Sequence, residues 1–353
     1  MGNCDSSIER KHISKLSINN DYSTNISSPS LPSISSSSKI IQKSNINNNN
    51  KRSNSTEKKL PSKNKQYILS ENISKREDIS QKYKLSKQIL GDGATSIVYV
   101  AEEISSKQKF AIKRIIKEKI LTKQDNIIKE SEICLKLKNK NIVNYYEIYE
   151  DIHFISIVME LGDTDLFELI TKNPQGVIQE DIAIDFLIQI FESIEYLHNT
   201  HNIIHCDIKP ENYIVKFDKN NRNKAILKLI DFGNIRRKPI NKERLFNFCG
   251  TKEYMAPETL ENYGFNEKVD EWAAGVIMFN LLTGADPFAS DNDSDYKDNI
   301  KFKNIKFDFI KNNSLRELNK KLLNRFIDRR ITAKEALEEI KIIKDNLKFN
   351  NIN

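Results

Sequence analysis

The chain is poor in the features that mark several classes of protein. Its 353 residues contain only four cysteines, and their wide spacing fits neither a disulfide framework nor a metal site: Cys4, Cys134, Cys206 and Cys249. No apolar run approaches the ~20 residues of a membrane-spanning helix, and the N-terminus lacks the hydrophobic core of a signal peptide. We therefore expect the folded part to lie in a reducing compartment.

The excess of positive charge lies in the first part of the chain. Residues 1–80 hold thirteen Lys and Arg against seven Asp and Glu, whereas the rest holds 43 against 42. The nearly neutral part has no recognition helix, zinc spacing or aromatic–basic stripe, so no nucleic-acid partner is expected. Residues 17–66 are rich in Ser, Asn and Lys and cannot bury enough apolar surface to fold. We predict a basic, disordered tail over residues 1–80.

The first residues, Met1-Gly2-Asn3-Cys4-Asp5-Ser6, fit the pattern for myristoylation of Gly2, with chance as the alternative. One myristoyl chain binds membranes with a constant on the order of 10⁴ M⁻¹, so stable attachment needs a second signal. S-acylation of Cys4 would supply it. The tail thus predicts a cytoplasmic protein held at the cytosolic face of a membrane.

Two short motifs carry the main chemical signal. Residues 205–212 read His-Cys-Asp-Ile-Lys-Pro-Glu-Asn, and Asp231-Phe232-Gly233 follows nineteen positions later. Either motif alone would suit an ordinary polar loop. Together they place Asp207, Lys209, Asn212 and Asp231 at the spacing of an ATP-dependent phosphoryl-transfer site.

A glycine-containing turn precedes these motifs. Residues 90–98 read Leu-Gly-Asp-Gly-Ala-Thr-Ser-Ile-Val and lie between two strand-like runs, Tyr83–Leu90 and Ile97–Glu102. Glycines at such a hairpin let backbone N–H groups approach phosphate oxygens, although many hairpins of this kind are only turns.

A strand and a helix are expected after this hairpin. Phe110-Ala111-Ile112-Lys113 alternates as a strand, and residues 123–138 have helical periodicity. Glu130 and Glu132 on this helix point about 200° apart, so only one of them can face Lys113.

Taken together, residues 83–340 resemble a eukaryotic protein kinase of the calcium/calmodulin-dependent group. The runs GATSIVY, NIVNYYEIYED, GTKEYMAPE and EKVDEWAAGVIMFNLLTG are similar to those of protist calcium-dependent protein kinases. The resemblance implies an α+β, two-lobed fold, with a β-rich N-lobe over 81–160, a helical C-lobe over 161–342 and a short tail over 343–353. It also implies an ion pair between Glu258 and Arg330.

The resemblance further implies ATP and Mg²⁺ as cofactors and a role for each motif residue. Lys113 would contact the nucleotide phosphates. Its partner would be Glu130, because the run Asn141-Ile142-Val143 resembles a family motif and Glu130 lies at the expected distance before it. Asp207 would be the catalytic base and Lys209 would contact the γ-phosphate, while Asn212 and Asp231 would hold the metal. The remaining ATP-binding positions would be Leu90, Gly91, Asp92, Gly93, Ala94, Thr95, Ser96, Val98, Ala111, Met159, Glu160, Gly162, Glu211 and Ile214.

The expected substrates are Ser and Thr hydroxyls of proteins, because Lys209 and the pair Gly250-Thr251 match Ser/Thr kinases. Thr251 would contact the catalytic loop. Asp165 and Glu211 lie near the position that recognises a basic residue upstream of the phosphosite, so a moderate basophilic preference is predicted. The alternative is that Asp165 only begins a helix.

The activation segment lacks the usual switch. Cys206 stands where many kinases carry an arginine that pairs with a phosphorylated residue, and no Ser, Thr or Tyr lies between Phe232 and Gly250. Asn247 stands where the phosphorylated threonine often lies. We expect activity without phosphorylation of this loop.

The residues do not favour calcium control by a segment of this chain. The chain ends about a dozen residues after Ile340, which is too short for the autoinhibitory helix and EF-hands of the calcium-dependent family. Asp291, Asp293 and Asp295 have the spacing of the first three ligands of a calcium-binding loop. Tyr296 stands where that loop requires glycine, so an acidic surface loop is expected. A calmodulin-like partner in trans stays open, and the protein is expected to be a monomer.

A pseudokinase scaffold is the rival hypothesis, and it predicts loss of a catalytic residue. Lys113, Asp207, Asn212 and Asp231 are all present, which favours an enzyme.

Overall fold

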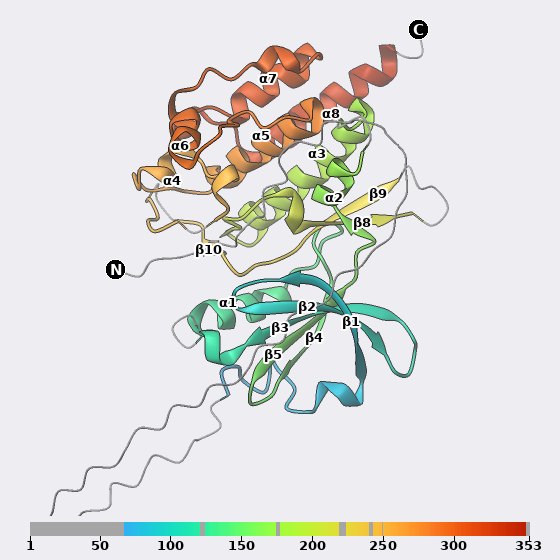
Figure 1. The fold of residues 1–353 in the computed structure, drawn as a ribbon. Coiled ribbons are helices and arrows are strands. Elements are labelled where there is room, and N and C mark those ends of the chain that lie inside the picture. The colour runs from blue at the N-terminus through green and yellow to red at the C-terminus, as the bar shows by residue number, and fades with distance from the viewer. Residues whose placement is uncertain are drawn as a thin grey trace, which may run out of the picture. The chain divides into compact units, whose positions relative to one another are not determined.

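The N-lobe is a five-stranded antiparallel sheet with one helix beside it (Figure 1). The computed structural model describes residues 67–120, 124–173, 177–218, 224–239, 243–248 and 250–350. The strands are β1 (Tyr83–Asp92), β2 (Ser96–Glu103), β3 (Lys109–Ile116), β4 (Tyr145–Glu150) and β5 (Phe154–Glu160), in the order β1-β2-β3-β5-β4. Isoleucines of the two central strands, such as Ile112, Ile115 and Ile157, are buried.

Helix α1 (Gln124–Cys134) lies beside this sheet and follows the short 3₁₀ helix η2 (Lys117–Ile120). The predicted helix over 123–138 therefore ends four residues early, at Cys134. Its apolar residues are buried as the periodicity indicates, with Ile127 and Cys134 in the main core. Residues 121–123 lie outside the described residues.

The folded region begins before residue 81, which corrects the predicted boundary of the tail. Residues 67–80 pack against the N-lobe sheet and include the 3₁₀ helix η1 (Ile79–Gln81), with Leu69 and Ile79 buried. The fully buried carboxylate of Glu150 accepts the backbone N–H groups of Ile68 and Leu69, at 2.6 and 2.9 Å, and pairs with Arg76. The residues that hold this segment lie 72 to 82 positions away in the sequence, so the local sequence does not predict that it folds.

The C-lobe is built mainly from helices around α5 (Lys268–Thr283). Every residue from Val269 to Phe279 is buried, as expected of a helix that is largely apolar around its circumference. Gly284 ends it with a φ of 71°, a left-handed conformation that glycine adopts without strain. The other helices are α2 (Leu166–Thr171), α3 (Glu180–Glu195), α4 (Pro257–Leu260), α6 (Asp293–Phe302), α7 (Asn313–Leu322) and α8 (Ala333–Asn350).

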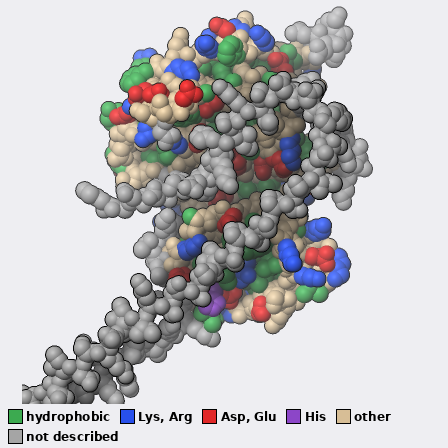
Figure 2. All heavy atoms as spheres, viewed as in Figure 1, with side chains coloured by type: hydrophobic (Ala, Val, Ile, Leu, Met, Phe, Trp, Pro, Cys, Tyr) green, Lys and Arg blue, Asp and Glu red, His purple; other side chains and the backbone are tan. Residues whose placement is uncertain are grey.

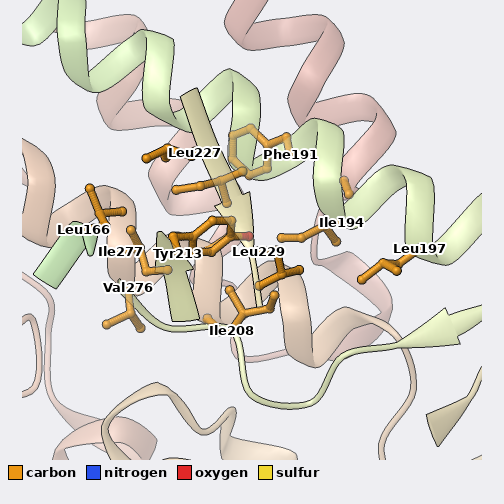
Figure 3. Packing of buried hydrophobic residues seen from close by; sticks show 14 of the residues in the cluster. Leu166, Phe191, Ile194, Leu197, Ile208, Tyr213, Leu227, Leu229, Val276 and Ile277 are labelled. Carbon is orange, nitrogen blue, oxygen red and sulfur yellow. The ribbon is translucent and has the colours of Figure 1, made fainter. Parts of the chain in front are cut away.

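A small three-stranded sheet lies on the side of the C-lobe that faces the N-lobe (Figure 1). It consists of β6 (Thr164–Asp165), β8 (Tyr213–Phe217) and β9 (Ala225–Leu229). Figure 3 shows Tyr213, Leu227 and Leu229 of this hairpin packed with Phe191 and Ile194 of α3. The hairpin is thereby fixed to the core. Of the long insertion at residues 216–226, the tip at 219–223 lies outside the described residues.

Shorter elements complete the C-lobe. Strands β7 (Ile203–Ile204) and β10 (Arg236–Arg237) pair with each other. A π-helical turn, Tyr196–Thr200, follows α3, and 3₁₀ turns span Pro210–Asn212, Lys252–Tyr254, Phe307–Phe309 and Ile327–Arg329.

The predicted α+β, two-lobed fold is confirmed, with two local corrections in the C-lobe. Residues 343–350 are not a tail, because α8 continues to Asn350 and buries Ile343. The segment around Asp295 is not an acidic loop: Asn292 caps α6, and the ring of Tyr296 is buried. Both segments are mostly polar, and their few apolar residues do not form a pattern that predicts a helix.

Charged side chains of both signs are interspersed over the visible face of the two lobes (Figure 2), in keeping with a nearly neutral domain. Within the described residues, no helix has the length and apolar character needed to cross a membrane.

Candidate active site

Lys113 joins the two lobes through two carboxylates. Its position on β3 places Nζ 2.7 Å from Oε1 of Glu130 on α1 and 2.8 Å from Oδ1 of Asp231 in the C-lobe. Burial disfavours the ammonium, but the two carboxylates outweigh burial and raise the pKa of Lys113. The same ammonium lowers the pKa of Asp231 to about 2, so both groups are charged at neutral pH. Glu132 is exposed, so of the two glutamates on α1 it is Glu130 that pairs with Lys113.

Phe232 fixes the segment that carries Asp231. The Phe232 ring is fully buried, with its centroid 5.2 Å from that of His205 and 6.0 Å from that of Tyr145. Asp231 has a φ of 64°, an uncommon conformation for a residue with a side chain. The packed phenylalanine thus holds a strained backbone that directs the Asp231 carboxylate toward Lys113.

The loop that carries Asp207 is held from below by Asp270 of α5. Asp270 accepts the backbone N–H groups of His205, at 2.8 Å, and Cys206, at 2.9 Å. It also lies 2.8 Å from Nε2 of His198, a buried side chain in the π-helical turn. Although burial disfavours an imidazolium, Glu271 and Asp270 raise the pKa of His198 to about 10. Cys206 has a φ of 67°, which these contacts stabilise.

Asp207 lies in a polar network with the activation segment. Its Oδ1 accepts hydrogen bonds from the backbone N–H of Thr251, at 3.0 Å, and from its hydroxyl, at 2.7 Å. Lys209 Nζ lies 3.2 Å from Oδ2 of Asp207 and donates to the Thr251 hydroxyl at 2.6 Å. The three side chains therefore hold one another, and Asp207 remains only 9% exposed.

Asn212 and Asp231 have the donor chemistry of a magnesium site. The Nδ2 of Asn212 donates to the backbone O of Asp207, at 2.8 Å, and to its Oδ2, at 3.3 Å. This leaves the amide oxygen of Asn212 without a partner among the described residues, and the same holds for Oδ2 of Asp231. Two such oxygens suit Mg²⁺, which binds one or two protein ligands besides substrate phosphates and water. The residues fit the ion.

The glycine-containing turn leaves room for a ligand. The β1–β2 hairpin closes with a bond from the Gly93 N–H to the Ser96 carbonyl at 2.9 Å. A Cβ added at Gly91 or Gly93 would lie no closer than 3.5 Å to the surrounding protein atoms. Packing within the chain therefore does not require glycine here, and close approach of a ligand to the backbone would explain it. Leu90 at the start of the turn is 47% exposed.

The apolar residues among the predicted ATP-binding positions lie near the same hairpin and the link between the lobes. Ala111 on β3 pairs with Met159 on β5, and both are buried, whereas Val98 is half-buried. Gly162 follows β5, and a Cβ there would lie 2.7 Å from Cβ of Ile214 on β8. A residue with a side chain at position 162 would clash with Ile214, so only glycine allows the chain between the lobes to lie this close to β8.

Other predicted site residues have different surroundings. Asp165 accepts the backbone N–H of Glu168 at 2.8 Å and caps α2, which is the helix-start role left open by the sequence. Glu211 is half-buried in the turn Pro210–Asn212. Gly2 and Cys4 lie outside the described residues.

The ion pair of Glu258 and Arg330 is present. Nη1 and Nη2 of Arg330 lie 2.7 and 2.9 Å from the two carboxylate oxygens of Glu258, and both side chains are buried. The geometry is bidentate, which is the stronger form of such a pair.

Sequence reasoning missed Asp270 and His198. Neither residue belongs to a short motif, and a lone histidine such as His198 carries no local signal. A buried carboxylate at the start of an apolar run is nevertheless a sign that backbone N–H groups or a cation bind there.

Comparison with known proteins agrees with this geometry. Residues 83–340 match the family described as Protein kinase domain. Calcium-dependent protein kinase 14 of Arabidopsis thaliana is 35% identical over 271 residues, which cover 74% of this chain and 49% of that protein. Myosin light chain kinase family member 4 of Mus musculus is 33% identical over 278 residues, covering 75% and 68%. This chain thus spans about half the length of the first relative and two thirds of the second. The chain belongs to the protein kinase family, among relatives that are serine/threonine kinases.

Proposed function

We propose that this protein transfers the γ-phosphate of ATP to Ser and Thr hydroxyls of proteins. The observation that carries the proposal is the simultaneous contact of Lys113 with Glu130 and Asp231. Transfer of a phosphoryl group depends mainly on positioning and on neutralising charge, and these residues supply both.

Asp207 is the group that would accept the proton of the substrate hydroxyl. Its Oδ1 is held by Thr251, and its Oδ2 lies near Lys209, so the carboxylate is fixed in orientation. Lys209 would compensate negative charge on the transferred group. Asn212 and Asp231 would hold Mg²⁺, which, when bound, neutralises charge on the phosphates.

Preference for Ser and Thr over Tyr is part of the proposal and rests on Lys209 and Thr251. A moderate preference for an upstream Arg or Lys rests on Asp165 and Glu211, although the capping contact of Asp165 engages one of its oxygens. A degenerate Ser/Thr peptide library tests both points. An acidophilic or proline-directed preference would remove the second.

Activity without activation-loop phosphorylation is a further part of the proposal. The pair of Lys113 with Glu130 and the buried Phe232 are already in place in the unmodified chain. Cys206 offers no guanidinium to a phosphate, and Arg236 donates instead to the carbonyls of Asn234 and Ile235. Phosphatase treatment should leave activity unchanged. A large loss of activity on phosphatase treatment would contradict this.

Membrane attachment and calcium control are proposed on narrower grounds. Gly2 and Cys4 fit a doubly acylated N-terminus, which would hold a cytoplasmic enzyme at a membrane. Gly2→Ala and Cys4→Ser should each move the protein to the soluble fraction. Calcium control through a calmodulin-like partner is proposed because one relative is a calcium-dependent protein kinase. The peptide assay with and without a calcium-loaded calmodulin-like protein tests it.

An assay with Mg-ATP and the peptide library tests the central proposal. Wild type should incorporate phosphate, and Asp231→Asn should lose nearly all of this activity. Binding of ATP without transfer by wild type would favour the pseudokinase scaffold instead.

A further inference from the structure

Lys216 on β8 contacts the chain that joins the two lobes. Its ammonium donates a hydrogen bond to the carbonyl oxygen of Leu161 at 2.9 Å. Lys216 lies two positions after Ile214, so both side chains project from the same face of the strand. Ile214 lies directly against Gly162, as the close Cβ approach shows. Strand β8 thus contacts this segment through both Ile214 and Lys216, which are neighbours on one face of the strand.

The bond to Leu161 fixes one particular peptide group. The carbonyl of Leu161 and the N–H of Gly162 belong to the same planar unit, and in a trans peptide they point to opposite sides. The described residues contain no cis peptide bond. Lys216 therefore sets the direction of the Gly162 N–H, which has no hydrogen-bond partner within the described chain. A fixed donor of this kind is available to a ligand.

The residues on both sides of this peptide are held as well. Before it, Glu160 pairs with Lys228 of β9 at 3.1 Å. After it, Asp163 donates its N–H to the carbonyl of Val215 at 2.9 Å and accepts the N–H of Phe217 at 2.9 Å. The segment from Glu160 to Asp163 is therefore bound to the β8–β9 hairpin throughout, and the Gly162 N–H stands out as its unused donor.

We propose that Lys216 is a positioning residue for the adenine base of the nucleotide. It holds the peptide of Leu161 and Gly162 in orientation, and its positive charge polarises that peptide so that the Gly162 N–H becomes a stronger donor. The inference rests on the proposed function, in which the protein binds ATP, and adds that the backbone between the lobes binds the adenine base. It also assigns a role to the long hairpin, whose position sets the affinity for the base.

The test separates the base from the phosphates. Calorimetry on the full chain measures the Kd of adenosine and of inorganic tripolyphosphate for wild type and Lys216→Met, which keeps the aliphatic part of the side chain. We expect adenosine binding to weaken roughly three- to tenfold, because a charge-assisted hydrogen bond is lost. Tripolyphosphate binding and kcat at saturating ATP should stay unchanged, while the KM for ATP rises.

Two variants serve as controls. Lys216→Arg keeps a cationic donor and should bind adenosine nearly as wild type does. Lys224→Met removes an exposed lysine of the same hairpin and should change neither affinity. If Lys216→Met does not fold, Lys216→Gln replaces it in the same measurements.

Each remaining outcome is decisive. Equal adenosine affinity of wild type and Lys216→Met, or equal weakening of adenosine and tripolyphosphate, would overturn the role of Lys216 while leaving the kinase proposal intact. Failure of wild type to bind adenosine and tripolyphosphate would reject the proposed function itself.

Discussion

The hydroxyl of Thr251 lies 2.7 Å from Oδ1 of Asp207, across 44 positions of sequence. The same hydroxyl accepts a bond from Lys209, so one small side chain connects the activation segment to two residues of the catalytic loop. Contacts of this kind hold the side chains of the catalytic loop in place, and they are direct subjects for mutation.

Thr251→Ala should lower kcat and leave the KM for ATP nearly unchanged. The change removes a hydrogen bond to a carboxylate worth about 1.5–3 kcal/mol, which corresponds to roughly a 10- to 150-fold decrease. Steady-state kinetics with a Ser/Thr peptide gives both constants. Thr251→Ser keeps the hydroxyl and should retain most activity. Equal kinetics for Thr251→Ala and wild type would show that the network does not position Asp207.

Glu130 and Glu132 form a matched pair for mutation on one helix. Glu130→Gln removes the charge that faces Lys113 and should lower kcat/KM roughly 10²-fold, because small displacements of a positioned group cost this much. Glu132→Gln alters an exposed side chain and should have no effect. Peptide phosphorylation by the two variants is compared in one assay. Similar losses for both would contradict the role of the ion pair.

His198 should make stability depend on pH in the alkaline range. Its pKa is raised from the ordinary 6.5 to about 10, so the folded state binds the proton more tightly than the unfolded state. This contribution to stability is complete below pH 6.5 and declines as the pH rises through 10. Urea midpoints between pH 6 and 10 measure the decline. His198→Asn should be less stable at pH 6 and should show a shallower dependence, whereas parallel curves for both proteins would rule this out.

Removal of Arg330 should destabilise the C-lobe without direct effect on the catalytic groups. Arg330→Met leaves the buried carboxylate of Glu258 without its partner, which costs about 3–5 kcal/mol. Chemical unfolding measures this loss. The exposed pair of Lys320 and Glu317 supplies the control, since Lys320→Ala should change stability by less than about 0.5 kcal/mol. A small effect of Arg330→Met would show that the pair is replaced by other contacts or by water.

The sequence was informative where function depends on short spacings. Asp207, Lys209 and Asn212 lie within six residues and contact one another, and the structure joins Asp231 to Lys113 across 118 positions. It was uninformative where a partner is distant. Lys216 meets Leu161 across 55 positions, and Glu150 meets Leu69 across 81, and an isolated lysine or glutamate has no pattern that predicts such a contact.

The limits of the fold were also hard to predict from local patterns. The segment over 67–80 shows no regular helical or strand pattern, and contacts with Glu150 and the sheet hold it in place. The last turns of α8 are mostly polar and resemble a tail, but Ile343 is buried and extends the helix. In both places tertiary contacts, rather than intrinsic propensity, determine the structure.

The short parallel bridge between Lys75 and Tyr149 has a consequence for the behaviour of the protein in solution. Strand β4 is at the margin of the five-stranded sheet, and its free backbone groups would offer a template to another chain. The backbone of Lys75 occupies the carbonyl of Ile148 and the N–H of Glu150, which protects this margin from intermolecular strand pairing. Loss of the segment before residue 77 would therefore favour aggregation.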